Sequence, residues 1–245
     1  MEIIDAHWDD ENLGVKSFEI VLSSHDKMSD FLLHEEQLIV EKNARYIVVK
    51  APVNVPDFLF ELPKLNYIFL ETAFSLSLKK DNYKYPSFLA RFDRSVEVRS
   101  LEDSYDLERI YGEISKGIFN TDRVAIDRNF TQQIANNRYI RWISSLVKQG
   151  EKVHEVYIDN KAIGFFILKS IDNNSVRGIL TGLYEKYSTS GYGLLIMKKL
   201  NDTVWNYGYK TYIAQVVSNN IKALRANLIF GSEIESMAYT YVKSL

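Results

Sequence analysis

The sequence of 245 residues contains no cysteine. This absence excludes disulfide bonds, metal sites built on thiolates and any covalent acyl intermediate carried on a cysteine sulfur. It also fits a reducing compartment. The four histidines show no pair at metal-ligand spacing, so we expect no bound metal and interpret them as structural or surface residues.

The sequence has no marked excess of positive or negative charge and no long apolar run. The formal net charge is -2, and nucleic-acid-binding proteins usually show a clear basic excess, so no nucleic-acid partner is expected. No stretch approaches the roughly 20 apolar residues that cross a bilayer, so no membrane association is expected. Residues 1–14, MEIIDAHWDDENLG, lack the basic start and apolar core of a signal peptide. We therefore expect a cytoplasmic protein.

Proline is confined to the first third of the chain, and its last occurrence is Pro86, after the polar stretch 79–85. This pattern predicts a lobe boundary, with an N-terminal αβ lobe over 1–86 and a larger domain over 87–245. In the first lobe, β-branched and aromatic content predicts strands over 18–22, 45–50 and 66–78. Helical patterns predict helices over 24–41 and 55–62. The lobe is expected to supply a second-substrate site or a dimer surface.

The larger domain has a clearer pattern. Ser100 and Asp103 resemble an N-cap box, and the helix expected after them has Leu107, Ile110 and Ile114 on one face. Further helices are predicted over 130–148, 191–207 and 220–230. Strands are predicted over 96–98, 153–158, 162–169, 178–184, 211–217 and 234–242, with a hairpin turn at 159–161. The predicted order is β-α-α-β-β-β-α-β-α-β.

A glycine-containing turn precedes the third of these helices. Two glycines spaced by one residue let the backbone approach a ligand closely, and free helix amides with the helix dipole favour an anion such as a pyrophosphate. A simple tight turn is the alternative, because Gly-x-Gly is common at helix starts. The turn consists of Ser188, Thr189, Ser190, Gly191, Tyr192 and Gly193.

This turn, in this order of elements, resembles the GCN5-related N-acetyltransferase (GNAT) superfamily. Both glycines match its cofactor motif, whereas Ser188 departs from the usual Gln or Arg. Asn220, Ala223 and Gly231 resemble a second family element. The resemblance implies an α/β (α+β) fold whose mixed sheet opens as a wedge for acetyl-CoA. It also implies that the wedge residues Thr181, Gly182 and Leu183 line the cofactor.

A closer resemblance extends over nearly the whole chain. Residues 8–14, 138–143 and 235–239, together with Arg123 after Phe119, are similar to segments of the dTDP-fucosamine acetyltransferase family. That resemblance implies transfer of an acetyl group to the amine of a dTDP-4-amino-4,6-dideoxyhexose. On this view Arg123 and Arg138 are candidates to hold a nucleotide diphosphate, and Tyr139 and Trp142 to line the sugar or stack on the base. Ordinary surface arginines and core aromatics are the alternatives.

The reaction class needs a base for the amine, a donor for the oxyanion and an acid for the thiolate. Asn227 occupies the position where the superfamily usually has a tyrosine acid, and an amide delivers no proton. Tyr239 and Tyr192 are candidate replacements. Glu71 is the candidate base, because apolar neighbours should raise its pKa; a salt-bridged or edge glutamate is the alternative.

Three functions therefore remain open. The first is acetyl transfer to a nucleotide-linked amino sugar, and the second is transfer to another primary amine, on a small molecule or a peptide. The third is a non-catalytic acyl-CoA-binding module, which the asparagine at 227 favours. A homodimer is also compatible with the sequence.

Overall fold

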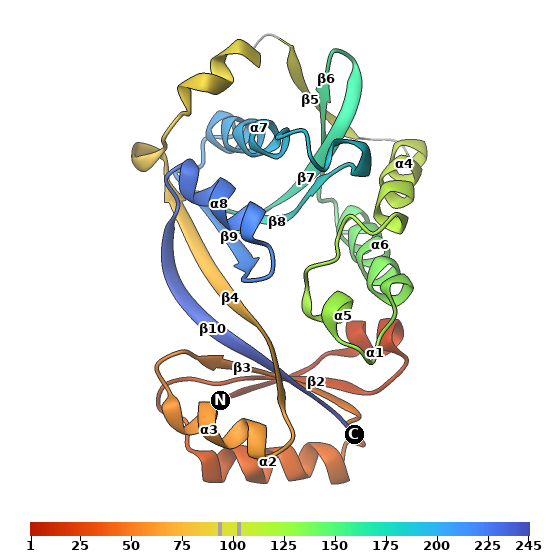
Figure 1. Ribbon diagram of the computed structural model, residues 1–245, viewed down its shortest axis with the longest axis vertical. Helices are drawn as coiled ribbons and strands as arrows, with labels where there is room; N and C mark the ends of the chain where they lie inside the picture. The colour runs from red at the N-terminus through yellow and green to blue at the C-terminus, as the bar shows by residue number, and fades with distance from the viewer. Residues whose placement is uncertain (93–94, 102–103) are drawn as a thin grey trace.

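A computed structural model describes residues 1–92, 95–101 and 104–245. Its centre is one ten-stranded mixed sheet in the order β1-β2-β3-β10-β4-β9-β8-β7-β6-β5 (Figure 1). The mixed α/β class predicted from the sequence is confirmed. Asp103 of the expected N-cap box lies outside the described residues. Among the described residues, no helix combines the length and the apolar character that crossing a bilayer requires.

The first eight elements alternate strand and helix before the connection to the second half. They are β1 (Glu2–Asp5), α1 (His7–Leu13), β2 (Ser17–Val21), α2 (Met28–Val40), β3 (Tyr46–Pro52), α3 (Pro56–Lys64), β4 (Ile68–Lys79) and the 3₁₀ turn η1 (Lys80–Asn82). The helix over 7–13 and the strand over 2–5 were not predicted. The strands and helices predicted in this half are confirmed, with boundaries shifted by one to four residues.

The second half follows the predicted order, with one short additional helix, α5. Its elements are η2 (Ser87–Phe92), β5 (Val96–Leu101), α4 (Ser104–Ser115), α5 (Arg123–Ile126), α6 (Gln132–Lys148), β6 (Val153–Ile158), β7 (Lys161–Ser170), β8 (Ser175–Leu183), η3 (Glu185–Tyr187), α7 (Gly193–Asn206), β9 (Thr211–Val217), α8 (Ile221–Ile229) and β10 (Glu233–Ser244). The hairpin turn is confirmed, because Asp159 and Asn160 both adopt positive φ, as a type I′ turn requires.

The helices cover both faces of the sheet. Helices α7 and α8 pack on one face around Leu200 and Phe230, and α2 and α3 pack around Phe31 and Phe58. Helices α4 and α6 cover the opposite face, with α1 and α5 beside them (Figure 1). Alternating residues of β3 divide between the two faces, as the twofold period of a strand requires.

The structure contains a topological repeat that the sequence does not reveal. The series β2-α2-β3-α3-β4 has the same connections as β8-α7-β9-α8-β10. Three of the five paired elements match in length, with seven residues in β3 and β9, nine in α3 and α8, and twelve in β4 and β10. The first helices differ by one residue, and β8 is longer than β2. The positive-φ residues also correspond, because Asn43 and Gly208 follow the first helix of each unit and Asn66 and Gly231 follow the second.

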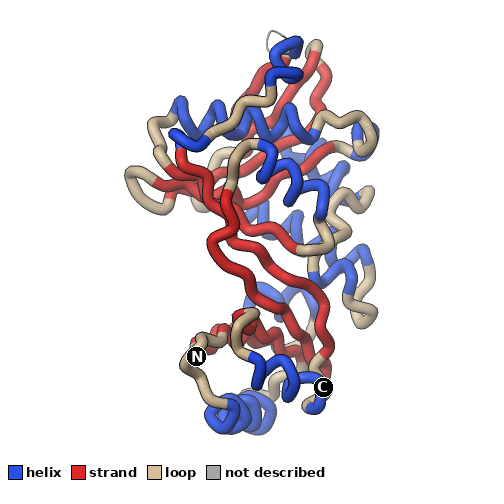
Figure 2. The backbone as a smooth tube through the Cα atoms, turned by 60° about the vertical axis from the view of Figure 1, so that its left-hand side comes forward, coloured by secondary structure: helices blue, strands red, loops and turns tan. Residues whose placement is uncertain are grey.

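Each unit contributes its last strand to the other. Strand β10 lies between β3 and β4, and β4 lies between β10 and β9. The registers are equivalent, since Ala73 faces Val217 and Ala238 faces Pro52. These two long strands form the waist of the molecule (Figure 2). The sheet therefore continues across the predicted boundary at residue 86, and the division into two domains stays a prediction.

Only the second unit has an opened pair of strands. In β8 and β9 the parallel pairing runs from Ser175 and Thr211 to Gly178 and Ala214, and no further pair joins the rest of these fully described strands. Strands β2 and β3 pair over their whole common length. The predicted wedge is thus present between the ends of β8 and β9, whereas the equivalent crevice of the first unit is closed.

Candidate active site

The turn before α7 has the features of an anion-binding loop. Residues 188–191 are exposed, and Gly191 has φ of 80°. Tyr192 donates its amide to Ser190 Oγ at 3.1 Å. Among the described residues, no acceptor faces the amides of Thr189, Gly191 and Gly193. These groups and the N-terminal end of the helix dipole suit a diphosphate.

The space around the loop also fits a ligand. A Cβ placed on Gly191 or Gly193 would meet no atom within 4 Å. Lys222 of α8 points toward the loop, with its Nζ 3.5 Å from the Ser188 carbonyl oxygen. The sequence interpretation missed this lysine, although it lies two residues after Asn220. A cation beside free amides is what a coenzyme A diphosphate needs.

Asn220 and Ala223 have a structural function in the same helix. Asn220 caps α8, and its side-chain oxygen accepts a hydrogen bond from the Ala223 amide at 3.1 Å. This contact satisfies one of the free N–H groups at the helix start. The pair therefore fixes the first turn of α8 at the edge of the wedge, beside Lys222.

The open arm of β8 forms one wall of the wedge. Thr181 is exposed, and Leu183 is half-buried. Gly182 is buried, and a Cβ there would lie 2.6 Å from the Phe165 ring, so the position requires glycine. The backbone of 181–183 is paired with β7 on one side and not with β9 on the other. Backbone groups facing the wedge are thus available to a bound chain.

Glu71 lies on β4 at the other wall, beside the end of β9. The residues on either side of it anchor that end. The Thr72 amide donates to Ser218 Oγ at 3.0 Å, the Ser218 amide donates to the Thr72 carbonyl at 2.7 Å, and Asn219 Nδ2 donates to the Leu70 carbonyl at 3.4 Å. Glu71 pairs with Thr240, which in turn pairs with Lys50 on β3. Lys50 lies on the same face of β3 as Val48, which packs with α5 and α6, so Glu71 faces these two helices.

The environment of Glu71 favours its neutral form. The residue is 5% exposed, and none of the described residues donates a hydrogen bond to its Oε2. Burial raises the pKa of Glu71 to about 7, and repulsion from Asp122 adds to the rise, whereas Arg123 and Lys50 oppose it. A carboxyl group with this pKa exchanges protons near neutral pH, as a general base should.

Arg123 and Arg138 meet near Glu71, but their charges are already neutralised. Arg123 Nη2 donates to Asp9 Oδ2, and Arg138 Nε donates to Asp9 Oδ1 at 2.7 Å. Arg138 Nη1 also lies 3.4 Å from Asp122 Oδ2. Burial alone would raise the pKa of Asp9, but the two guanidinium groups lower it below the ordinary value. Asp9 was not predicted, although it lies within the Trp8–Gly14 segment.

The aromatic residues predicted for the substrate side fall on α6. Tyr139 is buried against Phe119, with 4.4 Å between ring centroids. Burial raises the pKa of the Tyr139 phenol well above the ordinary value, and the negative charges of Asp122 and Glu71 add to the rise. Trp142, 39% exposed, continues the aromatic row. The structure thus brings Glu71, Asp122 and Tyr139 together from distant parts of the sequence.

Tyr239 and Asn227 lie away from this cluster. Tyr239 packs on the opposite face, with its ring 5.6 Å from the Phe69 ring in the α2 and α3 layer. Asn227 is 3% exposed on α8, and its Nδ2 donates to the Ala223 carbonyl at 2.9 Å. Tyr192 packs on Tyr187 beside the glycine loop. Tyr239 and Asn227 thus lie on the opposite face of the sheet from Glu71.

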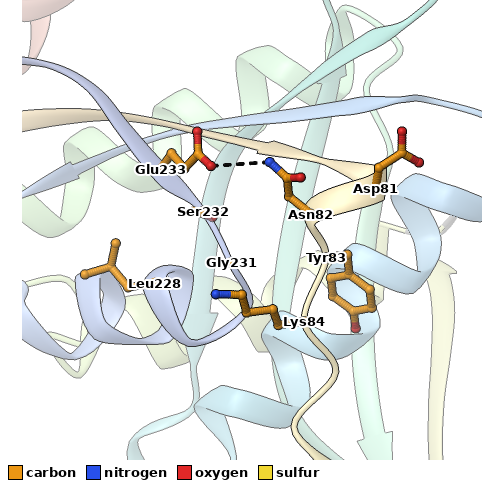
Figure 3. Close-up of a pocket in the computed structure, with 8 residues that line it drawn as sticks. All are labelled: Asp81, Asn82, Tyr83, Lys84, Leu228, Gly231, Ser232 and Glu233. Carbon is orange, nitrogen blue, oxygen red and sulfur yellow. Dashed lines mark hydrogen bonds between the residues drawn. The ribbon is translucent and has the colours of Figure 1, made fainter.

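A surface cavity lies apart from this site. It measures about 530 Å³ and lies between the segment 81–84 and the C-terminal end of α8 (Figure 3). Asn82 Nδ2 donates to Glu233 Oε1 across it at 3.3 Å. Among the described residues, no group of three or more histidine, aspartate or glutamate side chains could hold a metal ion.

Comparisons with known proteins find similarity of structure. No family model matches the sequence, and no curated protein sequence matches it. A GCN5-related N-acetyltransferase from Sphaerobacter thermophilus aligns with a TM-score of 0.66 and 10% identity, over 99% of this chain and 75% of its own. A functionally unknown conserved protein from Staphylococcus epidermidis aligns at 0.65 and 12%, over 94% and 84%.

A third structure is the GCN5-related glucosamine N-acetyltransferase region of a fungal multi-domain GH3 β-N-acetylglucosaminidase. It aligns with a TM-score of 0.67 and 13% identity, over 99% of this chain and 31% of that one. At these identities the comparison establishes the fold, so the chain has the GNAT fold. The resemblance to the dTDP-fucosamine family stays a prediction.

Proposed function

We propose that this protein is an acyl-CoA-dependent N-acyltransferase that uses acetyl-CoA. The observation that carries the proposal is the single opened crevice, which has an anion-binding loop at one end and a carboxyl group with a pKa of about 7 at the other. The loop can bind the diphosphate of the acyl donor, and the carboxyl group can act as the base that direct acyl transfer to an amine requires. The GNAT fold is consistent with this function but does not establish it.

The residues present fit the cofactor. The free amides of the glycine loop and Lys222 would hold its diphosphate, and the open arm of β8 would lie along its pantetheine chain. When bound, acetyl-CoA supplies an activated acyl thioester. The backbone N–H groups of 181–183 would orient the acyl carbonyl by donating hydrogen bonds to it.

Glu71 would accept the proton of the acceptor ammonium at a carboxylate oxygen, which leaves a neutral amine. Asp122 and Tyr139 lie close enough to Glu71 to interact with it electrostatically, and the negative charge of Asp122 would help to keep the pKa of Glu71 near neutral. Tyr239 lies in the α2 and α3 layer and stays the candidate acid. Asn227 in its present conformation donates within its own helix.

We propose an amino sugar as the acceptor, in the nucleotide-linked form that the sequence resemblance implies. The arrangement of Arg123 and Arg138 weighs against a direct contact of these two with a nucleotide diphosphate, because Asp9 binds both. A smaller primary amine is therefore the alternative acceptor. The buried amide of Asn227 favours a further candidate, a non-catalytic acyl-CoA-binding module.

One experiment separates these functions. The protein is incubated with acetyl-CoA and a panel of amines that includes dTDP-4-amino-4,6-dideoxyhexoses, free amino sugars, polyamines and peptides, and free thiol is measured. Thiol release that requires an amine and is lost in Glu71→Gln would support the transferase. Binding of coenzyme A by calorimetry, without release for any amine, would support the binding module. Failure to bind coenzyme A would refute both.

A further inference from the structure

The C-terminal part of β8, which we call the open arm, is paired with a strand on one side only. Residues Leu180–Leu183 have lost β9 as a partner and are held in the sheet only by their pairs with β7. A strand with one free edge is prone to move or to pair elsewhere. This arm leads directly into the cofactor loop, so its position sets both the width of the crevice and the placement of that loop.

Tyr184, the residue that follows the open arm, is hydrogen-bonded to the buried carboxylate of Glu155. Glu155 of β6 is 0% exposed, and its two oxygens accept four hydrogen bonds. Arg109 of α4 donates through Nε to Oε1 at 2.9 Å and through Nη2 to Oε2 at 2.5 Å. The Tyr184 hydroxyl donates to Oε1, and the Tyr157 hydroxyl donates to Oε2. Each carboxylate oxygen thus receives one guanidinium bond and one tyrosine bond.

Helix α4 holds the same point of the chain through the backbone as well. Glu113, one turn after Arg109, accepts a hydrogen bond from the Glu185 amide at 3.0 Å. Tyr184 is 3% exposed, and its own amide donates to the Ile163 carbonyl at 2.9 Å. Burial raises the pKa of the Tyr184 phenol, and its hydrogen bond to Glu155 adds to the rise. The hydroxyl therefore stays protonated and stays a donor.

We propose that Arg109, Glu155 and Tyr184 form a clamp that positions the open arm of β8 and so keeps the cofactor crevice open. The inference rests on the proposed function for its consequence, which is cofactor affinity. The clamp itself is a property of the protein alone. Tyr184 and Glu155 act through the arm and are positioning residues.

Two tyrosines bonded to one carboxylate allow a matched test. Tyr184→Phe and Tyr157→Phe each remove one hydroxyl bond to Glu155, but only Tyr184 adjoins the arm. Tyr157→Phe also removes the hydrogen bond that Arg109 Nη2 donates to the Tyr157 hydroxyl at 3.1 Å, which makes it the more severe change to the carboxylate's surroundings. Losing a hydrogen bond to a charged group typically changes an equilibrium by roughly ten- to a hundredfold. We expect Tyr184→Phe to speed amide exchange in peptides covering residues 180–185 by about tenfold or more. The same variant should weaken coenzyme A binding by a similar factor, with kcat at saturating cofactor unchanged.

Tyr157→Phe should leave both the exchange of this segment and the coenzyme A affinity within about twofold of the wild type, even where both variants lower Tm alike. Equal effects of the two variants, or normal exchange at 180–185 in Tyr184→Phe, would overturn the clamp. If Tyr184→Phe does not fold, Glu113→Ala tests the same point through the Glu185 amide. Wild-type protein that binds no coenzyme A would refute the proposed function, and the exchange comparison would still decide the clamp.

Discussion

Replacing Glu71 with glutamine should stabilise the protein above neutral pH while it removes activity. The pKa of Glu71 is raised by burial from 4.5 to about 7. Below pH 4.5 the carboxyl group is neutral in both the folded and the unfolded state. Between pH 4.5 and 7 the unfolded chain releases the proton and the folded chain keeps it, so stability falls as the pH rises. Above pH 7 the carboxyl group is ionised in both states, and the free energy of unfolding is lowered by the full cost of burying its charge.

The size of this change in stability follows from the shift in the pKa of Glu71. Two to three pKa units at about 1.4 kcal/mol each correspond to about 3 kcal/mol, an upper value because water entering the site would relieve part of it. Glutamine has the same shape and no charge at any pH. We therefore expect Glu71→Gln to equal the wild type near pH 4 and to exceed it by up to about 3 kcal/mol at pH 8. For a chain of this size that is about 6–12 °C in Tm.

The assay is denaturant unfolding of both proteins at half-unit steps from pH 4 to 8, together with thiol release at saturating acetyl-CoA. Turnover should drop by roughly 10²–10⁴-fold, the usual contribution of a general base. Glu97→Gln, the same change at an exposed glutamate of β5, should alter neither quantity. A stability difference that does not vary with pH would refute the assignment of the raised pKa to Glu71. Unchanged turnover across pH would remove Glu71 from the mechanism.

Three further predictions follow from the crevice and the core. Gly193→Val should abolish coenzyme A binding and keep the fold, since its Cβ meets open space; Gly112→Val on α4 is the control, and calorimetry with circular dichroism checks both. Gly193→Val is a better test than Gly191→Val, because Gly191 has a positive φ and a valine there would also strain the backbone. Calorimetry should find one coenzyme A per chain, because β2 and β3 are paired throughout; two would contradict the closed first crevice. Burial lowers the pKa of His154 to about 4, so its ionisation should lower the free energy of unfolding by up to about 3 kcal/mol as the pH falls from 6.5 to 4. In urea unfolding the difference between His154→Phe and the wild type should change by that amount over this range, and a difference that is constant with pH would contradict the buried neutral histidine.

Much of the candidate site depends on long-range contacts with no local signature. The apolar segment 67–74 predicted a raised pKa for Glu71, and the structure agrees. The partners Asp122, Arg138 and Tyr139 come from a segment more than 50 residues away. No spacing rule connects them, because they meet only once α5 and α6 pack on the waist of the sheet. Asp9 was missed for the same reason, since nothing local marks it as the partner of two arginines.

The sequence by itself predicted most of the order of elements and the position of the glycine-containing turn before α7. Period-two and period-3.6 patterns, and turn residues such as Asp159, Asn160 and Gly208, act within a few neighbours and are visible in one dimension. The tertiary structure alone decided that two units of the same topology exchange their last strands, that one crevice opens and the other stays closed, and that two arginines share the carboxylate of Asp9. These features come from pairing and packing between distant segments, where unlike residues such as Asn43 and Gly208 satisfy the same backbone geometry.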